Sequence, residues 1–105
     1  MRRLVVSERA EEDLREIWIY SFKTWGEAQA DRYLDELDAG LQECGSEPER
    51  GKQRDEVRPG YWSLLIGRQV AFYTFTDDEV LVQRVLHSSM DPNLHLEEDD
   101  DDLEA

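Results

Sequence analysis

The chain has 105 residues, of which 39% are hydrophobic and 36% are charged, and its formal net charge is −14. This length is close to the modal size of one domain, and this composition can bury one modest core beneath a well-solvated surface. No stretch approaches the ~18 apolar residues of a membrane span. The apolar run Leu4–Val6 is also too short for a signal peptide. We therefore expect a globular protein of the cytoplasm, and the single cysteine, Cys44, agrees with a reducing compartment.

The acidic residues are unevenly distributed. Residues 97–105 contain seven acids and no base. Such a run repels itself and has little apolar surface to bury, so we predict a domain over residues 1–96 and a disordered acidic tail over residues 97–105. The rest of the chain still has 19 acids against 12 bases. Because binding to phosphates needs a coherent basic surface, this balance disfavours sequence-specific nucleic-acid binding and favours a protein partner.

The first half of the chain has the pattern of a short strand followed by two helices. Leu4–Val6 is typical of a strand, and Ser7 is a good N-cap because several acids follow it. Apolar residues at steps of three and four predict helices over residues 8–23 and 27–44. The short break at Thr24–Gly26 predicts an antiparallel hairpin. Residues 17–22 are apolar all round, so the end of the first helix must pack against the second helix, a partner or both.

The second half changes to the period of strands. Residues 49–57 are charged and aperiodic, which predicts a loop, and residues 61–66, 69–75 and 80–86 predict three strands in a meander. The fold class is therefore α+β: an N-terminal strand, an antiparallel αα-hairpin and a three-stranded antiparallel meander, with the helices on one face of the sheet. Residues 72–75 are apolar on both faces, so we expect the face away from the helices to accept a helix or strand of a partner. The sequence does not determine the strand order.

Motifs of enzymes and metal sites are absent from the sequence. It contains no glycine-rich phosphate loop, no CxxC or HExxH and no nucleophile elbow. His87, Asp91 and His95 are spaced by four, but Pro92 interrupts the helix that would align them as ligands. Ser88 or Ser89 lies too close in sequence to His87 and Asp91 for a catalytic triad. We therefore predict no catalytic residue, no metal and no cofactor.

Four phrases of the sequence resemble the ParE toxins of the RelE/ParE superfamily. They read AEEDLREIWIY at residues 10–20, WGEAQADRYL at 25–34, VRPGY at 57–61 and RVLHSSMD at 84–91. The resemblance extends from residue 4 to about residue 96, and the last phrase is its most specific part. It implies a bacterial toxin encoded beside a cognate antitoxin, with a helical hairpin on an antiparallel sheet.

Two activities occur in this superfamily. RelE-like members are ribosome-dependent endonucleases that cut messenger RNA, whereas ParE-like members bind DNA gyrase and stall it with its DNA broken. The ribonucleases commonly have an arginine shortly before a strand tyrosine, where this sequence has Val70–Phe72 before Tyr73, and further basic residues where it has Ser88 and Ser89. The resemblance therefore implies a gyrase poison; the alternatives are a messenger RNA endonuclease and an antitoxin-binding protein that has lost its toxicity or acts on another target. It also implies a hetero-oligomer with a ParD-like antitoxin and no membrane partner.

Eight residues are candidates for binding the target or the antitoxin. Some have a structural interpretation as well: Arg84 would pair with Asp13 or Glu16, Trp25 would pack under the second helix, and His87 would hydrogen-bond to backbone at the end of its strand. The arginines that border strands would otherwise face solvent. The candidates are Trp25, Arg58, Arg68, Tyr73, Arg84, His87, Met90 and Asp91.

Overall fold

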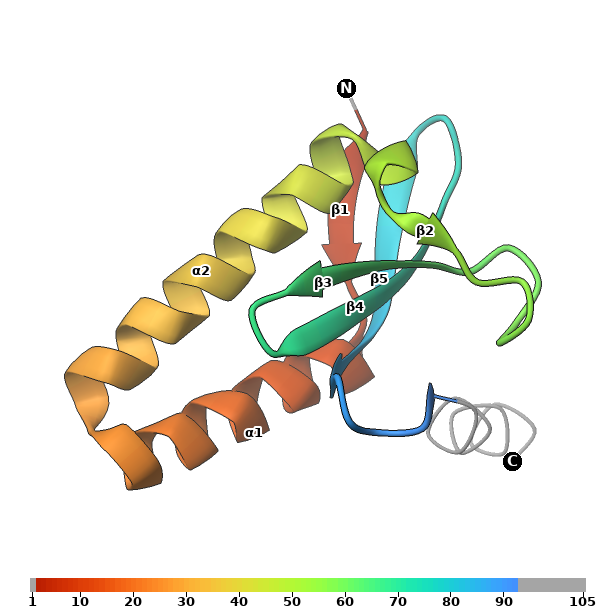
Figure 1. Cartoon of the computed structure of the whole chain (residues 1–105). Coiled ribbons are helices and arrows are strands. Elements are labelled where there is room, and N and C mark those ends of the chain that lie inside the picture. The colour runs from red at the N-terminus through yellow and green to blue at the C-terminus, as the bar shows by residue number, and fades with distance from the viewer. Residues whose placement is uncertain (1, 93–105) are drawn as a thin grey trace.

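A computed structural model describes residues 2–92 of the chain (Figure 1). The predicted helices and the four predicted strands are all confirmed, with bounds that differ by no more than two residues. The predicted tail over residues 97–105 lies outside the described residues. In chain order the elements are β1 (Arg3–Val6), α1 (Glu8–Trp25), α2 (Glu27–Ser46), the 3₁₀ turn η1 (Pro48–Arg50), β2 (Lys52–Gln53), β3 (Trp62–Ile66), β4 (Gln69–Phe75) and β5 (Glu79–His87).

The two helices begin and end where the local chemistry requires it. The Ser7 hydroxyl accepts a hydrogen bond of 3.0 Å from the amide of Ala10, which caps the first turn of α1. Gly26 separates the helices with φ at +93°, a conformation that side chains with a Cβ rarely adopt. From this glycine the helices diverge in a V (Figure 1). The predicted hairpin is therefore confirmed.

The sheet has the strand order β1-β5-β4-β3-β2. β1 pairs with β5 in parallel, and the other neighbouring strands are antiparallel. The prediction of a structureless loop over residues 49–57 is wrong in part, because η1 and β2 fall within or next to that range. A two-residue strand has no period that a sequence pattern can reveal. β2 forms through its pairing with β3, between Lys52 and Ser63 and between Gln53 and Trp62.

One face of the sheet packs against the helices. Buried side chains from α1, α2, β4 and β5 form its main cluster, which consists of Ala10, Leu41, Ala71, Val82 and Val85. α2 approaches β3 closely at Gly40, where a Cβ atom would lie only 2.6 Å from the Ile66 side chain. A residue without a side chain is needed there. The sequence-derived placement of the helices on one face is therefore confirmed.

Tyr73 belongs to the core and not to a binding surface. Its side chain is fully buried beside Cys44 and Val80, and its hydroxyl donates a hydrogen bond of 2.6 Å to the carbonyl of Pro48. The same burial raises the pKa of the Tyr73 hydroxyl and raises the pKa of the Cys44 thiol to about 12. The prediction that Tyr73 contacts a target or antitoxin is wrong, because β4 directs it toward α2.

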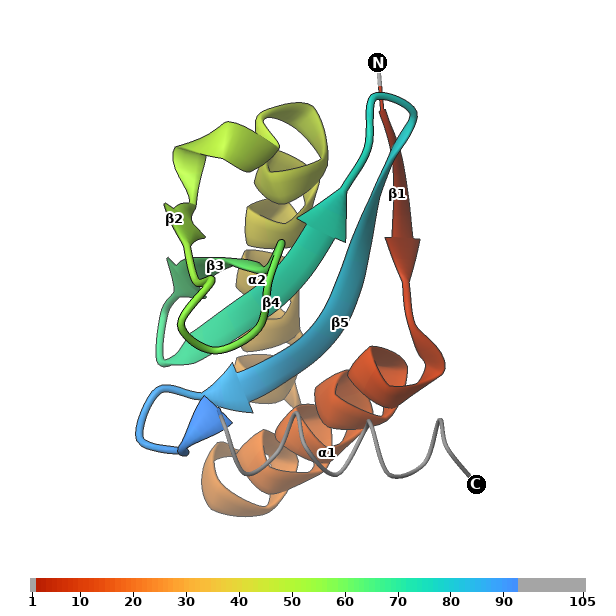
Figure 2. The ribbon, with the colours of Figure 1, turned by 90° about the vertical axis from the view of Figure 1, so that its right-hand side faces the viewer.

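The opposite face of the sheet is covered by the chain itself at Phe72. Phe72 and Leu86 pack with Val57 and Tyr61, which lie in the segment between β2 and β3. Figure 2 shows this segment in front of β4, on the side opposite α2. The guanidinium of Arg54 also lies 5.5 Å from the centre of the Phe72 ring. The expectation that a partner covers this face is therefore wrong at Phe72, because an aperiodic segment folds back over it.

Candidate functional site

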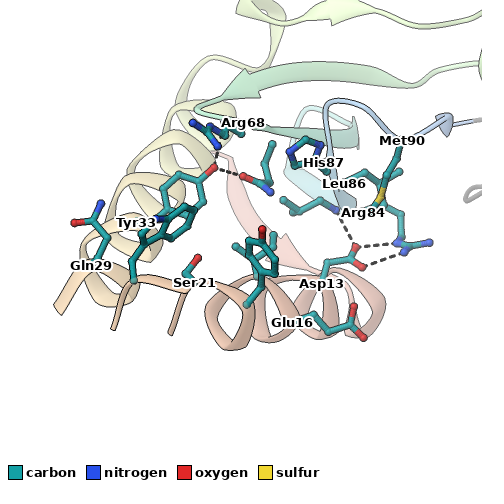
Figure 3. Close-up of a pocket in the computed structure, with 15 residues that line it drawn as sticks. Asp13, Glu16, Ser21, Gln29, Tyr33, Arg68, Arg84, Leu86, His87 and Met90 are labelled. Atoms are coloured by element: carbon teal, nitrogen blue, oxygen red, sulfur yellow. Dashed lines mark hydrogen bonds and ion pairs between the residues drawn. The ribbon is translucent and has the colours of Figure 1, made fainter. Parts of the chain in front are cut away.

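A pocket of about 660 Å³ lies between the two helices and the end of the sheet (Figure 3). α1 forms one wall, α2 forms a second wall, and the turn between β3 and β4 and the end of β5 form the third. The lining residues are Asp13, Glu16, Ile17, Tyr20, Ser21 and Trp25 of α1, Gln29 and Tyr33 of α2, and Arg68, Gln69, Arg84, Val85, Leu86, His87 and Met90. The pocket thus joins segments from both halves of the chain.

A buried ion pair closes one end of the pocket. The carboxylate of Asp13 accepts hydrogen bonds from Nε and Nη2 of Arg84 at 2.8 and 3.0 Å, and from the backbone amide of Val85 at 3.0 Å. Asp13 is 8% exposed and Arg84 is 5% exposed. β1 pairs with β5 only as far as Val82, so the carboxylate satisfies a strand amide that lies beyond the end of β1. Arg84 was a candidate both for binding a target and for an ion pair with an acid of the first helix, and the structure shows the ion pair with Asp13.

Tyr33 connects the helical wall to the turn between β3 and β4. Its hydroxyl donates a hydrogen bond to Oε1 of Gln69 and accepts one of 3.1 Å from the backbone amide of Arg68. The backbone of Arg68 is therefore held in place, while its side chain is exposed at the rim of the pocket. A partner with an anionic group can reach this guanidinium without breaking the fold.

Exposed aromatic side chains from the C-terminal part of α1 form the other end of the pocket, whereas the exposed thioether of Met90 lies beside Arg84 (Figure 3). Tyr20 is 66% exposed, Trp25 is 52% exposed and Met90 is 44% exposed. The rings of Tyr20 and Trp25 meet edge to face with centroids 6.1 Å apart. The interpretation of Trp25 as packed under the second helix is wrong, because α1 extends to Trp25 and presents it at the pocket.

The end of α1 that is apolar on all sides contacts α2 at one residue and is exposed at others. Trp18 faces α2, where its indole donates a hydrogen bond of 2.9 Å to Asp31, and its ring stacks on Phe22 at 5.2 Å. Ile19, Tyr20 and Phe22 are exposed. The prediction of a second helix against this end is confirmed at Trp18, and a partner on the exposed residues stays a prediction.

His87 is fixed by the turn that follows β5. The backbone amide of Ser89 donates to Nδ1 of His87 at 3.1 Å, and the Ser89 hydroxyl lies 2.7 Å from the same nitrogen. Because Nδ1 accepts from an amide, the neutral imidazole carries its proton on Nε2. Ser88 also donates to the carbonyl of Arg68 at 2.9 Å, which links this turn to the one between β3 and β4. His87 is thus held by backbone, as one interpretation of the sequence has it.

The charged groups of the pocket are balanced. Two arginines, Arg68 and Arg84, face two carboxylates, Asp13 and Glu16. The guanidinium of Arg84 is neutralised at contact distance by Asp13.

Within residues 2–92, no three side chains of His, Cys, Asp or Glu are close enough together to hold a metal ion. The helices of that range also lack the length and apolarity that a membrane span requires.

The structure gathers five of the eight candidate residues into this pocket. They are Trp25, Arg68, Arg84, His87 and Met90. Of the other three, Tyr73 is in the core, Arg58 lies on the segment that covers the opposite face, and Asp91 is exposed just beyond the lining residue Met90. These three do not line the pocket.

Sequence reasoning missed two aromatic residues of the pocket as site residues, Tyr20 and Tyr33. A signal for each was present. Tyr20 lies in the turn that is apolar all round, and Tyr33 is three residues after Ala30 and four before Leu37, both of which are buried. Gln69 carried no signal, since its role depends on its contact with Tyr33.

The fold and the pocket define a small α+β protein of the RelE/ParE-like class. A solved structure described as the chromosomal ParDE TA system from P. aeruginosa matches it with a TM-score of 0.74. The match covers 83% of this chain and 96% of that one at 18% sequence identity, so it bears on the fold.

Sequence comparison identifies the family. A model of the family described as the ParE toxin of the type II toxin-antitoxin system parDE matches residues 4–92. The chain is 38% identical to Toxin ParE1 of Mycobacterium tuberculosis over 95 residues, which cover 90% of this chain and 97% of that protein. It is 38% identical to Toxin ParE1 of Caulobacter vibrioides over 96 residues, covering 91% and 99%, and 30% identical to Toxin ParE of Escherichia coli, covering 87% and 89%. The chain belongs to the ParE toxin family and is a toxin of a type II toxin–antitoxin system.

Proposed function

We propose that this toxin acts in the cytoplasm by poisoning DNA gyrase, without catalysing a reaction of its own, and that a ParD-like antitoxin neutralises it by binding at the pocket. The toxin would trap gyrase while its DNA is broken and so block replication. Membership of the family establishes a toxin of a type II toxin–antitoxin system, and this proposal adds a specific target and a specific binding surface.

The charge balance of the pocket is the observation that supports a poison over a ribonuclease. Cleavage of RNA requires prearranged positive charge to stabilise the phosphate as charge develops, together with groups that transfer protons. Here Arg84 is held by both carboxylate oxygens of Asp13, and Glu16 lies on the same wall. Arg68 is left as the exposed cation among the lining residues. Such a pocket suits recognition of a protein better than catalysis on a phosphate.

A gyrase cleavage assay tests the proposed target. Purified toxin, gyrase, supercoiled plasmid and ATP are incubated, and denaturant and protease then release any trapped complex. We expect linear DNA to accumulate with toxin, because gyrase itself makes the break. In a parallel reaction, messenger RNA on programmed ribosomes should stay intact.

A variant separates the two mechanisms further. Arg68→Ala removes the exposed guanidinium of the pocket and keeps the backbone contacts of the turn, and a urea unfolding midpoint equal to that of the wild type checks that the variant is folded. Messenger RNA cut in the ribosomal A site by the wild-type protein, but not by Arg68→Ala, would overturn the gyrase proposal and make the toxin an enzyme.

The proposed antitoxin site depends on the exposed apolar side chains that line the pocket. Tyr20, Trp25 and Met90 offer aromatic and thioether surface of the kind that anchors protein interfaces. Protection of these side chains can be measured by hydroxyl-radical footprinting of the toxin with and without antitoxin. We expect strong protection of Tyr20 and Met90 and little protection of Leu65, which is exposed on β3. Equal labelling of Tyr20 and Met90 in both states would contradict this site.

A further inference from the structure

The outer side of α1 carries apolar side chains that do not line the pocket. Ile19 is 42% exposed and Phe22 is 45% exposed, and neither is among the residues that line the pocket. Ser21, which α1 buries, is two residues after Ile19 and so lies on nearly the opposite side of the helix. The partly buried ring of Trp18 stacks on Phe22 and continues this surface toward α2. We call Trp18, Ile19 and Phe22 the outer apolar patch; in Figure 1, α1 lies at the lower edge of the molecule, with α2 and the sheet above it.

Two opposite charges lie beside this patch. Glu16 is three residues before Ile19 and Lys23 is four residues after it, so both lie next to Ile19 on the same flank of α1. Both side chains are exposed, and within residues 2–92 neither has an ion-pair partner. They are two helical turns apart, about 10 Å along the axis, which is too far for them to pair with each other. A second copy of α1 in the antiparallel orientation supplies a partner to both.

We propose that the outer apolar patch binds the same patch of a second copy of this chain, with the two α1 helices antiparallel about a two-fold axis level with Tyr20. This register places Trp18, two residues before the axis, opposite Phe22 of the second copy, two residues after it. Glu16 then lies within one residue, about 1.5 Å along the helix, of Lys23 of the second copy. A two-fold axis keeps both charges on the same flank of the interface and forms the pair twice.

Charge favours this register and keeps the association weak. An axis level with Ile19 would place Arg15 opposite Lys23 of the second copy, so like charges disfavour it. The net charge of −14 makes two copies repel, but a Debye length of about 8 Å at physiological ionic strength limits the repulsion to groups near the interface. One helix face is a small interface, so we expect a dissociation constant on the order of 10–100 µM. Because the patch lies outside the pocket, this inference does not rest on the proposed function.

Sedimentation of the full chain at physiological ionic strength, from well below to well above this constant, tests the dimer. We expect the wild-type protein to pass from monomer to dimer over that range. Phe22→Ser removes an aromatic side chain from the centre of the patch and should weaken the dimer at least about tenfold. Leu65→Ser is the matched control, because it replaces another exposed apolar side chain, on β3, by the same polar one. Its dissociation constant should equal that of the wild type.

A charge swap tests the register. Glu16→Lys and Lys23→Glu each bring like charges together at both pairs of the dimer, so each variant alone should stay monomeric where the wild type dimerises. An equimolar mixture of the two variants should dimerise again, because every facing pair is then opposite in charge. This recovery also shows that both variants are folded.

Three results would overturn the proposal. The first is a wild-type protein that is monomeric at every concentration. The second is a dimer that Phe22→Ser and Leu65→Ser weaken equally or leave unchanged. The third is a mixture of Glu16→Lys and Lys23→Glu that behaves like the separate variants. None of these measurements uses gyrase or antitoxin, so their failure is distinguishable from a failure of the proposed function.

Discussion

At the end of the pocket near β5, Asp13 and Arg84 bury opposite charges and satisfy a strand amide, whereas at the other end Tyr20 and Trp25 leave apolar surface exposed. Asp13 at one end and Tyr20 at the other lie on the same helix, about two turns apart. The buried end uses polar groups whose partners are all within the chain, so it contributes to the fold. The exposed end uses side chains whose natural partner is another apolar surface, so it suits binding. A set of lining residues alone does not separate these two roles.

The largest effect on stability should come from Asp13→Ala. This substitution leaves Arg84 buried without its counter-charge and removes the acceptor of the Val85 amide. Removing one partner of a buried ion pair costs about 3–5 kcal/mol. Urea unfolding should show this loss as a lower midpoint with the same slope. Glu16→Ala, one turn away on the pocket wall and exposed, should stay within about 0.5 kcal/mol. Equal effects of the two substitutions would show that the buried carboxylate of Asp13 contributes no more to stability than an exposed one.

A slightly smaller loss of stability is expected from Leu37→Ala, because Leu37 lies on the buried face of α2. Leu37 is 1% exposed, so truncation leaves a cavity and should cost about 2–5 kcal/mol. The free energy of unfolding can be compared with that of Glu36→Ala, which changes the exposed neighbour on the same helix and should be nearly neutral. An unchanged urea midpoint in Leu37→Ala would mean that this face of α2 is exposed to water.

The sequence predicts the elements that have a period and misses those that do not. The helices and the long strands repeat their apolar residues at regular steps, so α1, α2, β3, β4 and β5 could be located. The pairing of β1 with β5 joins residues more than 70 positions apart, and no local pattern encodes it. η1, β2 and the segment that covers Phe72 depend on contacts with the sheet that no local pattern encodes.

The candidate site was predictable where a phrase of the family marks it. Trp25, Arg84, His87 and Met90 fall in such phrases, and Arg68 lies in a turn that the strand periods define. Tyr73 was wrongly assigned, because alternation along a strand gives two faces but does not say which one the helices cover. The contact of Asp13 with Val85 was not predictable, since it depends on where β1 stops pairing with β5.

Tyr73→Phe should have a moderate effect on stability and none on binding. The substitution removes the hydroxyl donor to the carbonyl of Pro48, which keeps only the longer hydrogen bond of 3.4 Å from the amide of Gly51. The expected cost is about 0.5–1.5 kcal/mol, measured by urea unfolding. Tyr20→Phe removes a hydroxyl from an exposed side chain and should be nearly neutral. A Tyr73→Phe variant that keeps full stability but binds antitoxin more weakly would return Tyr73 to the binding surface.

The smallest effect on stability, and the largest on binding, should come from Trp25→Ala. Its ring is half exposed and meets Tyr20 edge to face, so the loss of stability should be about 1 kcal/mol or less. Aromatic anchors at the centre of an interface cost about 2 kcal/mol or more when truncated, which corresponds to about a 30-fold weaker affinity. Calorimetric titration with the antitoxin gives this affinity, and Leu65→Ala is the control, because Leu65 is exposed but does not line the pocket. A Trp25→Ala protein that binds as tightly as Leu65→Ala would show that the exposed end of the pocket is not where the antitoxin is recognised.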